Sequence, residues 1–437
     1  MHSRPVLPVH RRVGRAMSRP SGSGRGRRRG DQRRPRSRSN QGRSLVGQEF
    51  EVEIGPVAHG GHCVARHEGR VLFVRHALPG ERVIARVTDG GDKSSFLRAD
   101  AVRVLEASDE RVDDGCPFAG PGKCGGCDWQ HTTAAYQRDL KTAVVREQLQ
   151  RLAGIEWNGQ VQAVPGDDDG AGWRTRVEFT ISGGGRLGLR GHRSHDIIKI
   201  DNCRIAHPLI GQVGLYQERF KPGLSGLDVA VTSENEVIAV ELPLESGDEI
   251  PVLGEVVAAN GREHEFEVSA RGFWQIHPGA TTTFVEHVLS KLAPVEGEKV
   301  LDLYCGVGLF SAFFADVVGA PNVLGVEGSE PAVEQAHANV PGASFIAGDV
   351  REQLDFLEAE ADLVVLDPPR TGAGREVIEA IAARAPRAVA YVACDPAALA
   401  RDLAYASEVG YAPTSIEAFD AFPMTHHVET IAILEPR

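Results

Sequence analysis

The C-terminal part of the chain alternates short apolar runs with segments whose apolar positions recur at helical spacing. The runs that predict strands cover 299–304, 323–327, 344–346, 363–366 and 389–393, and helices are expected near Leu309, Pro331, Glu376 and Ala398. This alternation predicts an α/β fold with a doubly wound, mainly parallel sheet. Because ligands of such sheets bind beyond the carboxyl ends of the strands, candidate chemistry is expected there.

Before this region, residues 45–105 show the two-residue alternation of β-strands. Strands are expected at 48–54, 69–74 and 81–87, separated by Gly and Pro turns. The pattern predicts a small β-barrel, a fold that often binds oligonucleotides. The barrel arginines are offset by several acids, so a purely structural barrel is an open alternative; they are Arg66, Arg75, Arg82 and Arg86.

The middle region is less regular and contains one clear hairpin. Its strands are expected at 173–181 and 186–190, with glycines 183–185 at the turn. Arg174 and Arg176 would share one face, because strand side chains repeat every two residues. They could bind phosphates or simply form a charged, solvated face.

Charge is distributed unevenly along the 437 residues. Residues 1–44 hold 14 Arg and one acid, Asp31, whereas the whole chain is −12, so residues 45–437 carry −25. The Arg, Gly, Ser and Pro mixture predicts a disordered tail. It could tether nucleic acid, act as a solubilising extension, serve as a transit peptide, or precede a true start at Met17.

Seven cysteines without a signal peptide favour a reducing, cytoplasmic location. No apolar run approaches about 18 residues, so no membrane association is expected. Cys124 and Cys127 flank two glycines, Cys116 lies upstream and Cys203 is distant in sequence. Four thiolates suit either a tetrahedral zinc or a four-iron cluster, and the spacing does not distinguish them.

A methyl-donor site is predicted where the first strand of the α/β region opens into a glycine turn, within Leu301–Gly308. Glycines allow a nucleotide-like ligand such as S-adenosylmethionine to approach the backbone closely. Glu327 follows about 20 residues later, where a carboxylate can accept ribose hydroxyls, and Asp349 could meet the adenine. A nicotinamide-binding fold shares this pattern.

Two further strand ends carry chemistry. The fourth strand ends in Asp367-Pro-Pro-Arg370, a rigid acidic turn, because proline cannot donate to the sheet. The fifth ends at Cys394, before a helix whose N-terminus would favour a thiolate. A buried Cys behaving as a small hydrophobe is the alternative. A thiolate could assist methylation of a poorly nucleophilic carbon.

Three motifs together closely resemble the RNA uracil-5-methyltransferase family: Asp367–Gly372, Cys394–Leu403 and Phe422–Glu429. The resemblance covers nearly the whole chain after residue 44. It implies a Rossmann-like class I methyltransferase domain at 266–437, an OB-like TRAM barrel at 45–105, and a central α+β iron–sulfur domain at 106–265. The tail occupies 1–44.

The resemblance also implies site residues and partners. Cys394 would be the nucleophile that attacks carbon 6 of uracil, and Glu429 the base that removes the proton from carbon 5. The residues implied for the donor are Gln275, Tyr304, Glu327, Asp349 and Asp367, and those for a [4Fe-4S] cluster are Cys116, Cys124, Cys127 and Cys203. The barrel and cysteines place the chain nearer the ribosomal than the transfer RNA branch.

Leu309 and His277 depart from the family pattern, which often has Asn at both positions, and donor affinity is expected to differ accordingly. A monomer acting on RNA, 23S ribosomal RNA rather than transfer RNA, is expected. An amino-group methyltransferase and a non-catalytic RNA-binding protein are the rival hypotheses. The acidic body requires that basic residues gather in one cleft or that the tail supplies the attraction.

Overall fold

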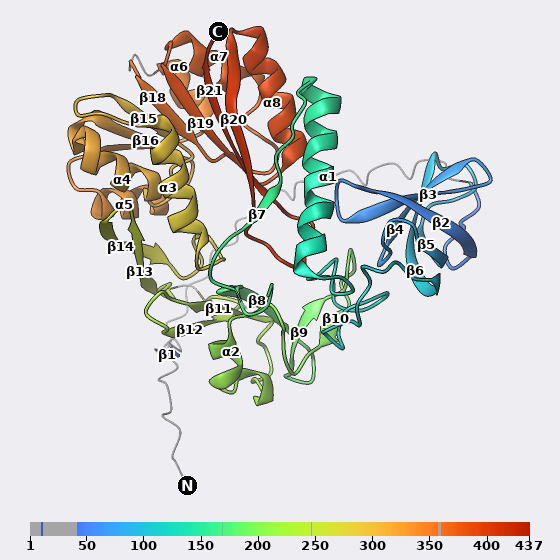
Figure 1. The fold of residues 1–437 in the computed structure, drawn as a ribbon. Coiled ribbons are helices and arrows are strands. Elements are labelled where there is room, and N and C mark those ends of the chain that lie inside the picture. Colours follow the sequence, from blue (N-terminus) through green and yellow to red (C-terminus); the bar gives the residue numbers. More distant parts are fainter. Residues whose placement is uncertain (1–9, 12–41, 168, 246, 357–359) are drawn as a thin grey trace, which may run out of the picture.

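The computed structural model describes residues 10–11, 42–167, 169–245, 247–356 and 360–437 (Figure 1). Apart from residues 10–11 and 42–44, the Arg-rich tail expected at 1–44 lies outside the described residues. The two described residues near the N-terminus, β1 (His10–Arg11), pair in parallel with β12 (Val237–Leu242) of the central sheet.

The N-terminal strands form a closed barrel in the order β2-β3-β4-β6-β5. Their bounds are β2 (Glu49–Ala58), β3 (His62–His67), β4 (Arg70–Arg75), β5 (Arg82–Asp89) and β6 (Phe96–Glu106). Alternate residues such as Val52 and Ile54 fill the interior, as the alternation predicts. Strands β3 and β6 were not foreseen, because several of their inward residues are small, including Cys63, Ala65 and Ala99.

The middle of the chain forms a six-stranded sheet in the order β1-β12-β11-β8-β9-β10. Its remaining strands are β8 (Arg176–Ile181), β9 (Leu187–Arg190), β10 (Ile197–Lys199) and β11 (Gly226–Val231), with α2 (Pro208–Gln212) beside them. The expected β8–β9 hairpin is confirmed. Arg176 is half-buried and pairs with Glu255 at 3.2 Å, so its guanidinium is committed within the protein rather than presented to phosphates or solvent.

The C-terminal sheet has eight strands in the order β17-β16-β15-β18-β19-β21-β20-β7. The strands are β7 (Val161–Ala163), β15 (Val300–Leu303), β16 (Val323–Glu327), β17 (Ser344–Ala347), β18 (Leu363–Leu366), β19 (Ala388–Ala393), β20 (Tyr411–Asp420) and β21 (Glu429–Pro436). All five strands expected between 299 and 393 are present and parallel. The expected α/β methyltransferase-type sheet is therefore confirmed, with β21 antiparallel to β19.

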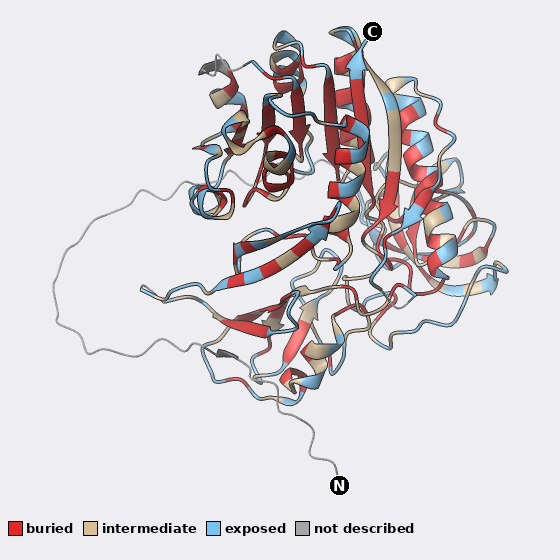
Figure 2. Ribbon diagram, turned by 60° about the vertical axis from the view of Figure 1, so that its left-hand side comes forward, coloured by how far each residue is buried: buried red, intermediate tan, exposed pale blue. Residues whose placement is uncertain are grey.

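Helices cover both faces of this sheet (Figures 1 and 2). They are α1 (Ala134–Ala153), α3 (Ala280–Leu292), α4 (Leu309–Val318), α5 (Glu330–Asn339), α6 (Val350–Phe356), α7 (Arg375–Ala383) and α8 (Pro396–Glu408). One hydrophobic core joins the sheet to α3, α4 and α5, and a second joins it to α1, α6, α7 and α8. Burial on both faces explains why the strands are continuous apolar runs.

Elements from the middle region of the chain also pair with this sheet or pack on its helices. Strand β7 pairs in parallel with β20 at the sheet edge, and α1 packs along α8. The two-stranded hairpin of β13 (Val252–Ala259) and β14 (Arg262–Ser269) packs against α3 and α5. Within the described part of the chain, no helix combines the length and apolar character needed to cross a bilayer.

Candidate active site

The turn between β15 and α4 is shaped by left-handed backbone at Tyr304, Gly306 and Gly308, with φ of 61°, 54° and 89°. The carboxylate of Glu327, at the end of β16, accepts hydrogen bonds from the N–H of Gly306 at 3.1 Å and of Ser329 at 2.8 Å. The structure therefore brings together the glycine turn and the acid that were predicted to hold the donor. Each carboxylate oxygen retains a lone pair that could accept a ribose hydroxyl.

Asp302, in the middle of β15, was missed by the sequence reasoning. Its Oδ2 accepts from the backbone N–H of Ser311 at 3.0 Å and from the Ser311 hydroxyl at 2.6 Å, which ties the turn to α4. Burial raises the pKa of Asp302 to about 7. An acid inside the apolar run Leu301–Leu303 was the signal that could have revealed it.

Asp349 follows β17 and accepts from the N–H groups of Arg351 and Glu352 at 3.1 and 3.3 Å. Burial raises the pKa of Tyr304 to about 12, and the charge of the nearby Asp349 adds to this effect. Their positions next to Glu327 agree with the expected arrangement at the carboxyl edge.

Gln275 lines a cavity of about 110 Å³ together with Thr175, His207 and Glu255. The neighbouring His277 is buried, stacks on Trp173 and accepts from the N–H of Gly279 at 3.2 Å. This departure from the family pattern is therefore part of a packed core.

The loop that follows the Asp367-Pro-Pro-Arg370 turn is held by a buried carboxylate whose role the sequence did not reveal. Asp402 Oδ2 accepts from the Tyr391 hydroxyl at 2.6 Å and from the N–H groups of Ala373 and Gly374 at 2.8 and 3.1 Å. A side chain at Gly372 would place its Cβ 2.7 Å from this oxygen. Asp402 thus fixes the loop that follows the acidic turn.

Cys394 and Glu429 are brought opposite each other by the register of β19 and β21. Ala393 pairs with Thr430, so Cys394 and Glu429 are the next residues on the two antiparallel chains. Residues opposite each other in this way have Cβ atoms about 5 Å apart. Glu429 is 4% exposed, and its Oε2 has no hydrogen-bond partner among the described residues.

Burial dominates the electrostatics of this pair. It raises the pKa of the Cys394 thiol to about 12, and the nearby Glu429 and Asp367 charges add to the effect, while Arg370 opposes it. Burial and Asp367 likewise raise the pKa of Glu429 well above its ordinary value. Burial, and then the charge of Asp302, raises the pKa of Asp367 to about 7.

The expectation that the α8 N-terminus would favour the Cys394 thiolate is not met in this arrangement. Asp395 is the N-cap of α8, and its Oδ1 accepts from the N–H groups of Ala397 and Ala398 at 3.0 and 2.8 Å. The helix N-terminus therefore already has a carboxylate partner, and the thiol has a raised pKa.

The four cysteines proposed as metal ligands line one cavity of about 310 Å³. Gln130 donates to Cys127 Sγ at 3.3 Å, and the Gly126 N–H to Cys124 Sγ at 3.4 Å. Within the described ranges, no three His, Cys, Asp or Glu side chains are arranged to hold a metal ion. Cys63 and Cys305 are buried in hydrophobic cores, and burial raises the pKa of both thiols.

Family comparisons agree with this architecture. Residues 43–102 match the TRAM domain, 300–389 a methyltransferase domain, and 350–437 the tRNA (uracil-5-)-methyltransferase family. The crystal structure of Pyrococcus abyssi tRNA (uracil-54, C5)-methyltransferase, in complex with S-adenosyl-L-homocysteine, has the same fold. Its TM-score is 0.64 at 24% identity, covering 88% of this chain and 100% of that one.

Two relatives are similar over nearly their full length. An uncharacterized RNA methyltransferase of Streptomyces coelicolor is 47% identical over 431 residues, covering 90% of this chain and 94% of the relative. One of Bifidobacterium longum is 36% identical over 420 residues, covering 88% and 96%. The chain therefore belongs to the RNA methyltransferases of the uracil-5-methyltransferase family, enzymes with a TRAM domain that use S-adenosylmethionine.

Proposed function

We propose that the enzyme methylates carbon 5 of a uridine in RNA through a covalent bond between Cys394 and the base. The observation that carries this proposal is the placement of a thiol and a buried carboxyl opposite each other, at the carboxyl edge of a donor-binding sheet. A methyltransferase acting on an amino group has no need of a thiol at this position. Carbon 5 of uracil, a weak nucleophile, does need one.

In the proposed reaction, the Cys394 thiolate adds to carbon 6, and the displaced electron pair forms an enolate that makes carbon 5 nucleophilic. Carbon 5 then takes the methyl group of the donor. The raised pKa of Cys394 means that its proton must leave during catalysis, and Arg370 is the cation that favours the thiolate. A thiolate generated in a buried site is correspondingly nucleophilic.

Glu429 would complete the reaction. Its carboxylate takes the proton from carbon 5, the electrons of that bond restore the carbon 5–carbon 6 double bond, and the thiolate leaves. A carboxyl with a raised pKa is a strong base once it is ionised, and Oε2 of Glu429 has no competing partner within the described residues. The target uridine must be unstacked to reach this buried pair.

A cavity of about 440 Å³ between the barrel and the middle region supports RNA as the substrate. Four cationic side chains line it, against three acids, Asp89, Asp100 and Asp196; the cations are Arg75, Arg98, Lys123 and Arg193. Burial lowers the pKa of His62 and of His192 to about 4, so these two imidazoles line the cavity in the neutral form. The small excess of cations favours phosphates in an otherwise acidic protein.

We predict different defects for the two reacting side chains. Cys394→Ala should abolish both methylation and covalent capture of RNA that contains 5-fluorouracil. Glu429→Gln should still add and methylate but fail to remove the carbon 5 proton. With ordinary RNA it should therefore accumulate a methylated covalent complex, visible on a denaturing gel.

Cys63→Ala is the matched control, because this thiol is buried in the barrel core rather than in the donor turn and should be dispensable for adduct formation. Substantial methylation by Cys394→Ala would refute the covalent mechanism and favour the amino-group alternative. A wild-type protein without donor-dependent activity on RNA would favour a non-catalytic RNA-binding role.

The pKa of Cys394 predicts how its reactivity depends on pH. Without RNA, alkylation by iodoacetamide should accelerate about tenfold per pH unit through neutral and mildly alkaline pH, because only the thiolate reacts. Arg370→Met should slow the reaction by removing the cation that lowers this pKa. Mass spectrometry of the Cys394 peptide measures the rate, and a plateau below pH 8 would contradict the prediction.

We infer that 23S ribosomal RNA is the substrate, on the resemblance of the barrel and cysteines to the ribosomal branch. The structural relative from Pyrococcus abyssi is named for uracil 54 of transfer RNA, so transfer RNA is the competing substrate. 5-Methyluridine should be mapped in both RNAs, from cells with and without the protein. One position of 23S ribosomal RNA should lose its 5-methyluridine when the protein is absent. Loss of 5-methyluridine from transfer RNA alone would reverse the assignment.

We propose that Cys116, Cys124, Cys127 and Cys203 hold a [4Fe-4S] cluster that supports the fold near the RNA cavity. The fit rests on four thiols lining one cavity. Four thiolates suit either zinc or a four-iron cluster, and the family resemblance of these cysteines is what favours the cluster.

Protein purified without oxygen should therefore be brown and contain about four iron atoms per chain. Cys124→Ser and Cys127→Ser should lose the iron, while Cys63→Ser, in the barrel core, should keep it. Iron assay and the visible spectrum provide the measurement. A colourless protein with equimolar zinc would show that the cluster assignment is wrong.

A further inference from the structure

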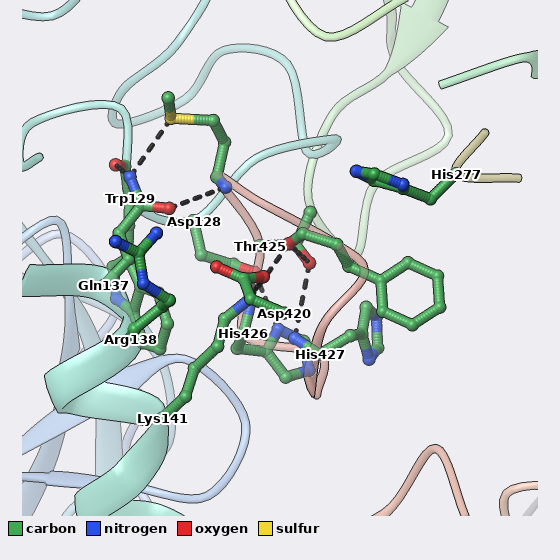
Figure 3. Close-up of polar contacts among 12 residues, drawn as sticks. Asp128, Trp129, Gln137, Arg138, Lys141, His277, Asp420, Thr425, His426 and His427 are labelled. Carbon is green, nitrogen blue, oxygen red and sulfur yellow. Dashed lines mark hydrogen bonds and ion pairs between the residues drawn. The ribbon is translucent and has the colours of Figure 1, made fainter. Parts of the chain in front are cut away.

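The segment 421–428, here called the catalytic loop, joins β20 to β21 and ends directly at Glu429. Figure 3 shows that its side chains meet residues from α1 and from the segment just after Cys127. None of these partners belongs to the strands that hold Cys394. The position of Glu429 therefore depends on contacts made far from it in the sequence.

Helix α1 holds the start of the catalytic loop. Lys141 is fully buried, pairs with the Asp420 carboxylate and donates to the Phe422 carbonyl at 3.0 Å. Gln137 accepts from the Met424 N–H at 2.7 Å. Met424 has φ of 66°, a left-handed conformation that persists in a Met only where its surroundings fix it.

Asp128 holds the end of the loop. Its N–H and that of Trp129 both donate to the Met424 carbonyl, at 2.8 and 3.1 Å. Its Oδ2 accepts from the His426 N–H at 3.1 Å and lies 2.6 Å from His426 Nδ1, while Oδ1 accepts from Arg75 Nη2 at 3.0 Å. A carboxylate only 8% exposed thus joins the barrel to the catalytic loop.

The barrel touches the same region at two more points. A Cβ on Gly61 would lie 2.9 Å from His426 Cβ and 3.0 Å from Asp128 Cγ, so the barrel turn packs directly against this contact. His59 Nε2 lies 3.0 Å from the carboxylate of Asp395, the residue after Cys394. The barrel is therefore part of the wall of the active site.

We propose that Asp128 is a positioning residue that sets Glu429, through His426, for removal of the carbon 5 proton. The inference rests on the proposed function. Cys394 is held independently, by β19 and by the N-cap of α8. Breaking the Asp128–His426 contact should therefore displace the base and leave thiol addition and methyl transfer intact.

Asp128→Asn tests this selectively. The remaining amide oxygen can still accept from Arg75, but the NH₂ group that replaces Oδ2 cannot accept from His426. Covalent complex formation with uridine RNA should stay close to wild type. Release of methylated RNA should slow by about tenfold to a hundredfold, because small misplacements of a catalytic group have effects of this size.

Rapid-quench sampling resolved on denaturing gels separates the two rates, and a transient methylated complex is the expected signature. His426→Ala removes the imidazole part of this contact from the loop side, away from the cysteines, and keeps the backbone N–H that donates to Asp128, so it should give a release defect in the same direction and no larger. Asp228→Asn is the matched control, because it disturbs an Asp–Arg pair with Arg271 that does not contact the catalytic loop.

The double variant Asp128→Asn with His426→Ala should release RNA no more slowly than Asp128→Asn alone, since Asp128→Asn already removes the oxygen that both His426 groups contact. The proposal would be overturned if the release defects of the two single variants multiplied in the double variant, or if the single variants released RNA normally. It would also be overturned if they slowed thiol addition as much as release. A release defect confined to Asp128→Asn and accompanied by iron loss would also overturn it. Absence of any wild-type covalent complex would instead refute the proposed function.

Discussion

The antiparallel pairing of β21 with β19 is the constraint on which the site depends. In a parallel sheet, the carboxyl ends of all the strands lie at the same edge, and ligands bind there. A strand running the other way begins at that edge, so its first residue meets the residue just beyond its neighbour. This reversal places Glu429 directly opposite Cys394 in the register of the two strands. A β21 parallel to β19 would carry Glu429 to the far end of the sheet.

Burial at this edge disfavours the charged forms of the thiol and the carboxyls, and this effect is useful in the proposed reaction. Cys394, Glu429 and Asp367 are crowded in a poorly solvated site, which favours the neutral form of each. In the proposed reaction, a neutral site admits an uncharged uracil without losing a strong ion pair. When the thiolate and the carboxylate do form, they are stronger as nucleophile and base than in water. Arg370 offsets part of the accumulated negative charge.

Much of the catalytic sheet was predictable because its strands are buried on both faces and read as apolar runs. The barrel was only partly predictable, since β3 and β6 have several small inward residues. Strand β20 was missed because Pro413 and a register shift interrupt its pattern. The positions of Glu327, Cys394 and Glu429 followed from strand ends. Asp402 and Asp302 did not, because their roles come from contacts that the sequence does not display.

The catalytic loop shows why a base at a strand start needs outside support. Glu429 is the first residue of β21, so sheet pairing begins with it, and the chain before it has no regular structure. Asp128 restrains that preceding chain through His426, which lies 298 residues after Asp128 in the sequence. Its neighbour Cys127 lines the cysteine cavity, and its partner Arg75 lines the basic cavity beside the barrel. One carboxylate thus joins the cavity proposed to face RNA, the cysteine-bearing segment and the loop that leads to the proposed base. Separating the barrel from this sheet would remove a support of Glu429 as well as that proposed surface.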